Sequence, residues 1–136
     1  MNPILLDTHA LLWFAEGSLS ERAATDIVAA SAENALLLSP VSAWEIGLLV
    51  ARGRLRLDRP VRAFVDAIYS RPGFVVASMT PAVAVESTTL PGDIHADPAD
   101  RILVASAIAY RAMLMTRDAK LHAYAKATKA FATLPC

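Results

Sequence analysis

The sequence predicts a single α/β domain whose parallel sheet is covered by helices on both faces. Short apolar runs alternate along the chain with longer stretches of helical spacing, and this alternation is typical of parallel strands joined by helices. The 136 residues have the length of one ordinary domain. Because the sequence contains no internal repeat, low-complexity tract or linker, we assign residues 1–136 to one domain.

The strand predictions rest on short, continuous apolar runs. A strand that is buried on both faces of a sheet carries apolar residues throughout rather than in alternation. Four such runs lie at residues 3–6, 35–38, 74–77 and 113–116, and residues 130–134 predict a fifth strand at the sheet edge.

The helix predictions combine helical spacing of apolar residues with start and stop signals. Ser20 is a typical N-cap. Pro40 suits the first turn of a helix that either Ser39 or Ser42 caps, and Gly53 is a typical stop after it. The predicted helices lie at residues 8–16, 20–31, 39–53, 59–73, 80–90, 99–112 and 118–127.

Composition indicates a protein of a reducing compartment. Apolar residues make up 55% of the chain and charged residues 19%, which favours a packed core and argues against disorder. Cys136 is the single cysteine, so no disulfide can form within the chain. The first residues lack the basic region of a signal peptide, and no apolar run reaches the roughly 20 residues that span a bilayer. We therefore expect a cytoplasmic protein without a membrane segment.

The formal net charge is zero, but the charges are unevenly distributed. Acids outnumber bases in residues 1–50, whereas residues 52–71 carry six arginines and only two acids. Such a basic strip, which begins with Arg52 and Arg54, could bind phosphates. A solvated helix and loop would explain the same charges.

Three carboxylates stand where a ligand would bind in a parallel α/β sheet. Asp7 and Asp118 follow the first and fourth predicted strands, and Glu45 lies in the first turns of the helix after the second strand. Ligands of open parallel sheets bind outside the carboxyl ends of the strands, near the point where strand order reverses. Asp97 and Asp100 open the helix before the fourth strand. Asp100 joins the other acids only if that helix starts near the same edge.

Each carboxylate also has a purely structural explanation. Asp7, Asp97 and Asp118 stand where an N-cap would accept backbone N–H groups. Glu45 would complete a capping box with Ser42, and Asp100 would interact favourably with the helix dipole at the third helical position. Taken singly, these residues are better explained by capping than by catalysis.

Taken together, the acids favour a metal site. Glu45 and Asp100 share helix faces with apolar residues, at positions 41, 48 and 49 and positions 103, 104 and 107 respectively. A carboxylate on a core-facing surface is costly unless it is paired, and several carboxylates in one cleft repel each other. A divalent cation removes that cost, and oxygen ligands with few histidines suit Mg²⁺ or Mn²⁺.

Four segments carry a resemblance to a known family. They are "ILLDTHALLWF", "SPVSAWEIGLLVARGRL", "LPGDIHADPADRILVASA" and "LMTRDAKLHAY". In this order and spacing they resemble a PIN domain of the VapC-like toxin type over nearly the whole chain. The resemblance implies a three-layer α/β/α sandwich and a metal-dependent ribonuclease. It also implies a small antitoxin partner and a homodimer.

The same resemblance suggests roles for individual residues. The acidic quartet that it places around Mg²⁺ or Mn²⁺ is Asp7, Glu45, Asp100 and Asp118. Asp97 matches the first acid of the family's "DPxDR" motif, where it starts the helix and supports the ligands from behind.

Further positions match or depart from the family pattern. Thr8 and Thr116 match frequent polar neighbours of the site. Ala99 stands where the family often has an aromatic residue, and Leu49 stands where it often has a lysine. Losing that lysine would weaken a phosphate contact or alter pairing with a partner.

The remaining histidines and tryptophans are given structural roles. His9, His95 and His122 are scattered, with no metal-binding pair among them, and are expected in loops or on the surface. Of the three, His95 is the best candidate for a functional histidine because it flanks the acids. Trp13 and Trp44 lie in apolar helices and are expected in the core, not as platforms for bases.

The sequence thus predicts an endoribonuclease in which a carboxylate-held metal activates water for in-line attack on an RNA phosphodiester. Arg52, Arg54 and Arg117 would contact the RNA backbone. One alternative is a phosphotransferase or phosphatase with Asp7 as nucleophile, although that chemistry typically uses a second carboxylate where His9 stands. The other is a non-catalytic regulator that binds a partner.

Overall fold

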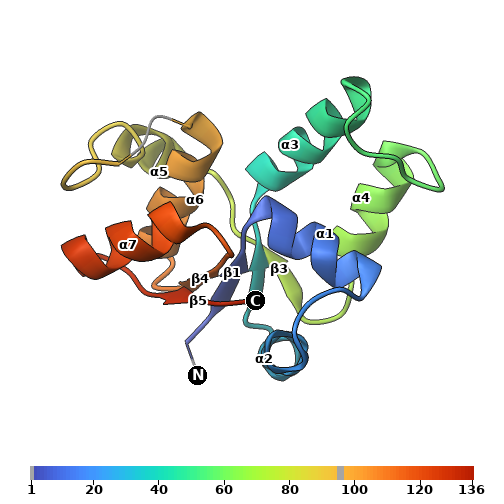
Figure 1. Cartoon of the computed structure of the whole chain (residues 1–136), viewed down its shortest axis with the longest axis horizontal. Coiled ribbons are helices and arrows are strands. Elements are labelled where there is room, and N and C mark those ends of the chain that lie inside the picture. Colours follow the sequence, from blue (N-terminus) through green and yellow to red (C-terminus); the bar gives the residue numbers. More distant parts are fainter. Residues whose placement is uncertain (1, 95–96) are drawn as a thin grey trace.

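A five-stranded parallel sheet forms the centre of the molecule (Figure 1). The computed structural model describes residues 2–94 and 97–136. The strands follow the order β3-β2-β1-β4-β5, and each neighbouring pair is parallel. They are β1 (Ile4–Leu6), β2 (Leu36–Leu38), β3 (Phe74–Val76), β4 (Met113–Met115) and β5 (Thr133–Leu134). Each strand lies within the apolar run that predicted it, which confirms the predicted sheet.

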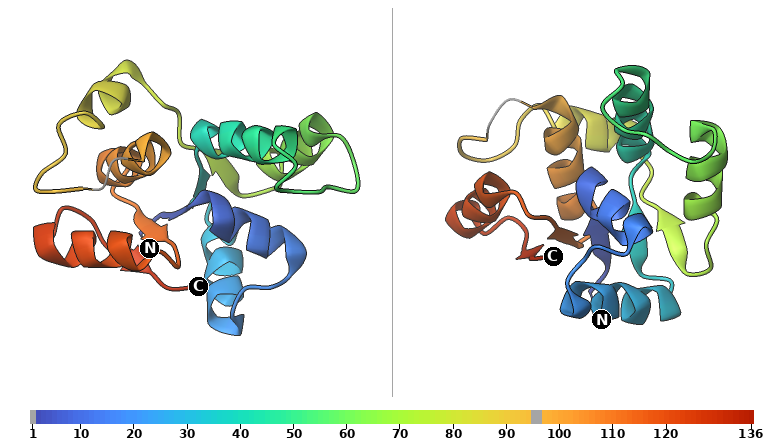
Figure 2. Two further views of the ribbon diagram at one scale, coloured as in Figure 1. Left: turned by 45° about the horizontal axis from the view of Figure 1, so that its top comes forward. Right: turned by 45° about the vertical axis from the view of Figure 1, so that its right-hand side comes forward.

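Helices cover both faces of this sheet, as Figure 2 shows from two further directions. They are α1 (Thr8–Glu16), α2 (Glu21–Ala32), α3 (Pro40–Ala51), α4 (Val61–Tyr69), α5 (Pro81–Glu86), α6 (Pro98–Ala109) and α7 (Ala119–Thr128). None of the helices in the described residues combines the length and the apolar character of a membrane span.

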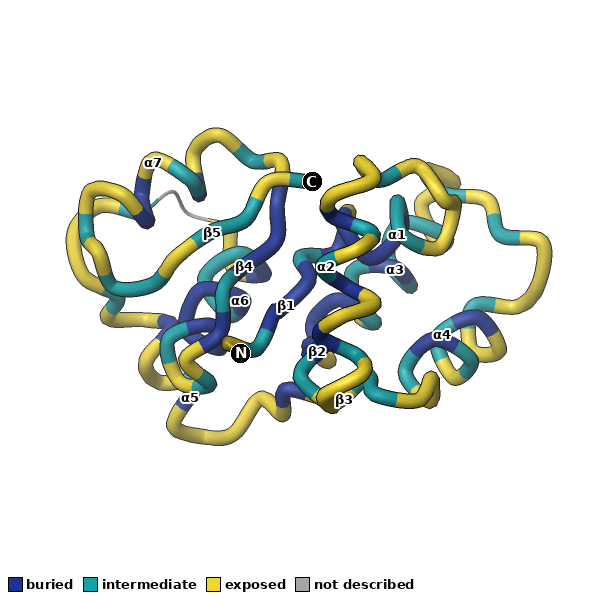
Figure 3. The backbone as a smooth tube through the Cα atoms, turned by 90° about the horizontal axis from the view of Figure 1, so that it is seen from below, coloured by how far each residue is buried: buried dark blue, intermediate teal, exposed yellow. Residues whose placement is uncertain are grey.

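Two hydrophobic clusters, one on each face, hold the layers together. Ile4 and Leu6 pack in one cluster with side chains of α1, α2, α3 and α4. Leu5 points the opposite way and packs in the other cluster with side chains of α6 and α7. Successive residues of a strand face opposite sides of a sheet, so β1 needs an apolar residue at every position. The central strands are accordingly buried along their length (Figure 3), and the three-layer α/β/α fold is confirmed.

The edge strand β3 differs from the prediction of a buried strand. Val75 and Val76 are 40% and 44% exposed. β3 pairs only with β2 in the sheet order, so it lacks the second neighbour and the full helical cover that bury the central strands. A continuous apolar run therefore identified the strand but not its position in the sheet.

Helix starts largely follow their local signals. The Ser20 hydroxyl accepts from the Ala23 N–H at 3.1 Å. For α3 the cap is Ser39, whose hydroxyl accepts from the Val41 N–H at 3.1 Å, and not Ser42. Gly53 takes a φ of 70° just beyond the end of α3, a left-handed conformation that favours glycine.

Strand register determines where the functional side chains meet. Leu6 pairs with Leu38 on one side and with Met115 on the other, so β1, β2 and β4 end at the same level. The chain begins at the central β1, builds outward to β3, and then crosses to β4 on the far side of β1. The reversal of strand order therefore lies between β1 and β4, where ligands of such sheets bind.

Candidate active site

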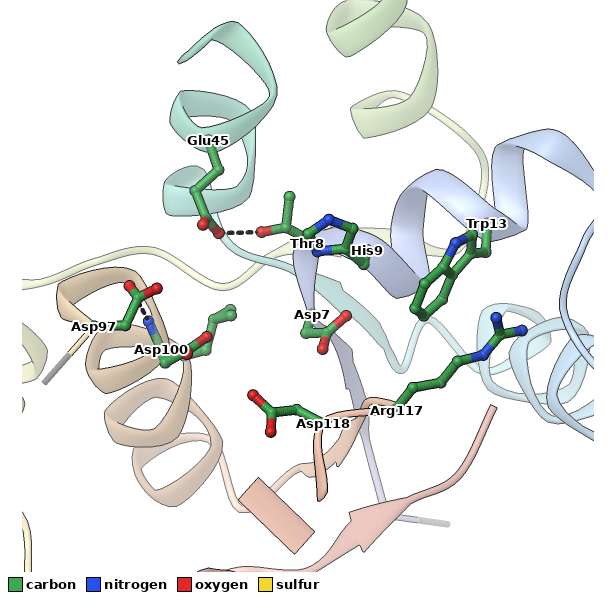
Figure 4. Close-up of a pocket in the computed structure, with 10 residues that line it drawn as sticks. Asp7, Thr8, His9, Trp13, Glu45, Asp97, Asp100, Arg117 and Asp118 are labelled. Carbon is green, nitrogen blue, oxygen red and sulfur yellow. Dashed lines mark hydrogen bonds between the residues drawn. The ribbon is translucent and has the colours of Figure 1, made fainter. Parts of the chain in front are cut away.

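A pocket of about 430 Å³ opens at this edge of the sheet, and we call it the carboxylate pocket. Its walls come from the starts of α1, α6 and α7, from α3, and from the turn after β4 (Figure 4). The lining residues are Asp7, Thr8, His9, Trp13, Glu45, Asp97, Asp100, Leu103, Arg117 and Asp118. All four acids of the predicted quartet therefore line one pocket.

Asp7 is held by hydrogen bonds to both carboxylate oxygens. As the N-cap of α1 it accepts from the Ala10 N–H at 2.7 Å through Oδ1, and the buried Thr116 hydroxyl donates to Oδ2. Burial raises the pKa of the Asp7 carboxyl above its ordinary value of 3.8, against the lowering effect of these hydrogen bonds. The nearby Asp118 carboxylate raises that pKa further. Asp7 is therefore the N-cap of α1, and its carboxylate also lines the pocket.

Thr116 also connects Asp7 to Asp118. The Thr116 hydroxyl accepts from the Asp118 N–H at 3.0 Å while it donates to Asp7. Asp118 is the N-cap of α7 and accepts from the Lys120 N–H at 2.8 Å. One fully buried threonine thus fixes the ends of β1 and β4 against each other and orients both acids.

Glu45 is oriented by the start of α1 rather than by its own helix. The buried Thr8 hydroxyl donates to Glu45 Oε1, and the same hydroxyl lies 3.0 Å from the Ser42 hydroxyl. The capping box between Glu45 and Ser42 is therefore wrong, because α3 begins at Pro40 and is capped by Ser39. Burial raises the pKa of the Glu45 carboxyl, and the Asp97 and Asp100 carboxylates raise it further.

Asp97 caps helix α6, whereas the Asp100 side chain lines the carboxylate pocket. Asp97 is the N-cap of α6 and accepts from the Ala99 N–H at 2.9 Å and from the Asp100 N–H at 3.4 Å. Asp100 is partly buried, and its side chain lines the pocket together with Leu103. α6 therefore begins at the sheet edge where the other acids lie, which sequence alone left undecided.

Arg117 is fixed on the far side of the pocket. Its Cζ lies 3.9 Å from the centroid of the Trp13 ring, and its Nη2 donates to the carbonyls of Ser18 at 3.2 Å and Cys136 at 3.0 Å. Trp13 is half-buried and lines the pocket instead of lying in the core as predicted. The contact between Trp13 and the Arg117 guanidinium could be recognised only from the tertiary structure.

His9 is a pocket residue that the sequence reasoning missed. It is exposed, as expected, but it lines the carboxylate pocket, and its ring lies 5.7 Å from that of Trp13. The spacing of four residues between His9 and Trp13 was a signal for this contact, because it places both rings on the same face of α1.

The other two histidines are placed differently. His122 is tied to the Thr116 carbonyl at 2.8 Å and to the Thr133 hydroxyl at 2.6 Å, which joins α7 to the sheet. His95 lies outside the described residues.

A second hollow of about 210 Å³ adjoins the carboxylate pocket. It is lined by His9, Trp44, Glu45, Leu48, Leu49, Arg52, Arg54, Asp97, Pro98 and Ala99. Trp44 is 58% exposed, so the prediction that it lies in the core is wrong. Arg52 and Arg54 line this second hollow and not the carboxylate pocket.

The donor set suits a hard divalent cation. Within residues 2–94 and 97–136, no three His, Cys, Asp or Glu side chains converge closely enough to form a ready-made metal site. The pocket nevertheless gathers five carboxylates, and burial raises the pKa of two of them. Mg²⁺ keeps several waters and is bound through few carboxylates. Widely spaced oxygen donors therefore fit it better than they fit an ion that demands a tight protein cage.

Comparisons with known proteins agree with this architecture. The model of the PIN domain family matches residues 4–127. Ribonuclease VapC22 from Mycobacterium tuberculosis is 30% identical over 125 residues, which cover 91% of this chain and 93% of that protein. Among solved structures, VapBC2 from Rickettsia felis bound to a promoter DNA fragment matches with a TM-score of 0.71, 14% identity and 97% coverage of both chains. FitAcB from Neisseria gonorrhoeae matches with a TM-score of 0.61, 19% identity and 96% coverage of both chains.

Proposed function

The chain belongs to the PIN domain family, and on this premise we propose that it is the endoribonuclease toxin of a toxin–antitoxin pair. Its similarity to Ribonuclease VapC22 over most of both chains supports the activity. The carboxylate pocket at the reversal of strand order is the single observation on this molecule that carries the proposal. The substrate is an RNA phosphodiester, and the reaction is hydrolysis.

The residues that we assign to metal binding are Asp7, Glu45, Asp100 and Asp118. Nucleases of this family generally depend on a divalent metal, and the oxygen donors favour Mg²⁺ or Mn²⁺ here. When bound, such an ion polarises a phosphoryl oxygen and makes water more acidic. Asp7 can serve as a ligand while it caps α1, because an ionised carboxylate offers about four lone-pair sites and two hydrogen bonds use only part of them.

The neighbouring polar residues hold these carboxylates in place. Thr116 and Thr8 donate to Asp7 and Glu45 from buried positions, so neither carboxylate has to be ordered when substrate binds. Asp97 caps α6 and thereby fixes the start of the helix that carries Asp100. Such supporting hydrogen bonds commonly tune metal affinity.

Arg117 is suited to bind a phosphate oxygen of the RNA. The Ser18 and Cys136 carbonyls engage Nη2, and the Trp13 ring covers one face of the guanidinium. The Cys136 side chain also takes a hydrogen bond from the guanidinium, and we assign the remaining N–H groups to the phosphate. A guanidinium that is already oriented loses little conformational entropy when it binds an anion.

The phosphotransferase alternative is disfavoured by the surroundings of Asp7. Such chemistry typically uses a second carboxylate two residues after the nucleophile, whereas His9 stands there and lines the pocket. A purely regulatory protein would gain nothing from carboxylates whose pKa is raised by burial and by each other.

The same family supports a proposal for the partner and the assembly of this chain. The structural neighbours VapBC2 and FitAcB are toxin–antitoxin complexes, which supports a cognate antitoxin for this chain. We also propose a homodimer in the cytoplasm. The exposed apolar side chains Val75, Val76 and Met79 near the β3 edge are consistent with such a contact.

The test is RNA cleavage by the purified protein with Mg²⁺, with Mn²⁺ and with EDTA, followed by sequencing of the product ends. We expect cleavage with either metal and none with EDTA, and restored cleavage when excess metal is added back. Cleavage that persists in EDTA would contradict a metal-dependent mechanism.

A further inference from the structure

Trp44 is an unusually exposed residue beside the carboxylate pocket. It is 58% exposed although it lies in α3, next to Glu45. Among the described residues it belongs to neither hydrophobic cluster. A tryptophan side chain favours burial because its apolar surface is large. Its exposure therefore calls for something that covers it.

The second hollow connects Trp44 to the carboxylate pocket. The two cavities share three wall residues, which are His9, Glu45 and Asp97. From there the second hollow follows α3 past Leu48 to Arg52 and Arg54. At 1.5 Å per residue, Arg52 lies about 10 Å along the helix axis from Glu45. The hollow thus leads from acids at one end to two exposed guanidinium groups at the other.

This order of groups matches a nucleotide that flanks the reacting phosphate. An indole ring offers a flat surface on which any base can stack. The side chains of Leu48 and Pro98 supply apolar walls for the faces and edges of a base, and two arginines can bind the phosphate that follows it. An acidic nucleic acid is thereby complementary in charge to the end of the hollow that is free of carboxylates.

We propose that Trp44 stacks on the RNA base next to the scissile phosphodiester while Arg52 and Arg54 bind the adjoining phosphate. This inference rests on the proposed function, because it takes the carboxylate pocket as the place of cleavage. Single-stranded RNA is the occupant favoured by the continuity of the two cavities. It makes Trp44 a substrate-positioning residue that sets binding strength and base preference.

The experiment measures RNA binding separately from cleavage. The probe is a fluorescein-labelled, mixed-sequence single-stranded RNA of about ten nucleotides, added to the protein in EDTA and followed by fluorescence anisotropy. Trp44→Ala should weaken binding by a factor of between about 5 and about 150, as expected for the loss of one stacked base. Trp44→Phe should restore most of the affinity, because a phenyl ring can still stack.

The arginines provide an independent arm with a matched control. Arg52→Ala and Arg54→Ala should each weaken binding and make it less sensitive to salt, because each removes a phosphate contact. Arg22 is exposed on α2 and lines neither cavity, so Arg22→Ala should change neither the affinity nor its dependence on salt. These exposed substitutions test the proposal even if Trp44→Ala were to lower the yield of folded protein.

The outcomes separate this inference from the proposed function. Binding that is unchanged in Trp44→Ala would overturn the inference, even if the wild-type protein cleaves RNA. So would a Trp44→Ala variant whose only defects are a changed oligomer mass in light scattering or lost binding to an antitoxin, since Trp44 would then lie in a protein interface. Trp44-dependent RNA binding in a protein that cleaves no RNA with Mg²⁺ would refute the proposed nuclease, and with it the placement of Trp44 next to a scissile phosphodiester.

Discussion

Two kinds of carboxylate line the same pocket, and they differ in what the fold asks of them. Asp7 and Asp118 follow strands and cap the next helices, so each satisfies backbone N–H groups that would otherwise lack partners. Glu45 lies on the body of α3 and caps nothing, and it is held by the Thr8 hydroxyl of another helix. The strand-end acids therefore satisfy backbone groups of the fold, whereas Glu45 satisfies none, and burial of its carboxylate costs the metal-free protein stability.

The largest expected effect is the loss of cleavage in Asp7→Asn and Glu45→Gln. Each should lower kcat/KM by more than about 100-fold, the upper range for changes that merely disturb the support of a ligand. Alanine substitutions of the same two residues should differ from each other in their effect on folding. Asp7→Ala should lower the free energy of unfolding by about 1 kcal/mol through loss of the cap. Glu45→Ala removes no cap and should cause no such loss.

Cleavage assays and urea unfolding of the metal-free proteins would measure both effects. The isosteric Asp7→Asn provides the control for the cap, because its side-chain oxygen can still accept from the Ala10 N–H. Full activity in either isosteric variant would remove that residue from the proposed metal site. Equal unfolding energies for the two alanine variants would abolish the contrast between strand-end and helix-face acids.

A smaller effect is expected from the buried threonines that hold the acids. Thr116→Val and Thr8→Val preserve shape but remove the hydroxyls that donate to Asp7 and Glu45. We expect activity at limiting Mg²⁺ to decrease by a factor of about 10 to about 100, with partial recovery at high Mg²⁺. Thr116→Val should be the more harmful of the two, because Thr116 also accepts from the Asp118 N–H.

Titration of Mg²⁺ in the cleavage assay would decide this point. Thr25, which is exposed and bonds within its own helix, gives a matched control in Thr25→Val. If Thr8→Val and Thr116→Val needed no more Mg²⁺ than this control, the threonines would serve packing alone.

The smallest effect concerns the pH dependence of folding. The folded-state pKa of Glu45 is raised above its ordinary value of 4.5, chiefly by burial. Between these two values the folded state binds more protons than the unfolded state, so stability of the metal-free protein falls as pH rises through this window. The penalty is fully present only above the folded-state pKa, and below pH 4.5 it disappears. Glu45→Gln should therefore raise the Tm of the metal-free protein at pH 7.

Thermal unfolding in EDTA at several pH values would test this sign. The gain in Tm from Glu45→Gln should shrink as pH approaches 4.5, and added Mg²⁺ should reduce it at pH 7 by stabilising the wild-type protein. A wild-type protein that is more stable than Glu45→Gln in EDTA at pH 7 would show that Glu45 is a structural residue.

Much of the fold could be predicted because its signals are local. The strand runs, the Ser20 cap and the Pro40 start depend on residues a few positions apart, and the structure agrees with them. The placement of Asp7 and Asp118 at one edge also followed from sequence, because each comes directly after a parallel strand. The edge position of β3 did not follow, because an apolar run has the same composition at an edge as in the centre.

The sequence by itself thus determined the elements, the α/β class and the family, and it predicted the acids that we propose as metal ligands. Only the tertiary structure decided that Asp100 reaches the carboxylate pocket, that Thr8 holds Glu45, and that Trp13 supports Arg117. It also decided that Trp44 faces solvent. The physical reason lies in α3, which carries apolar residues all round. Such a helix has no unique face to bury, so its neighbours alone determine which side remains open.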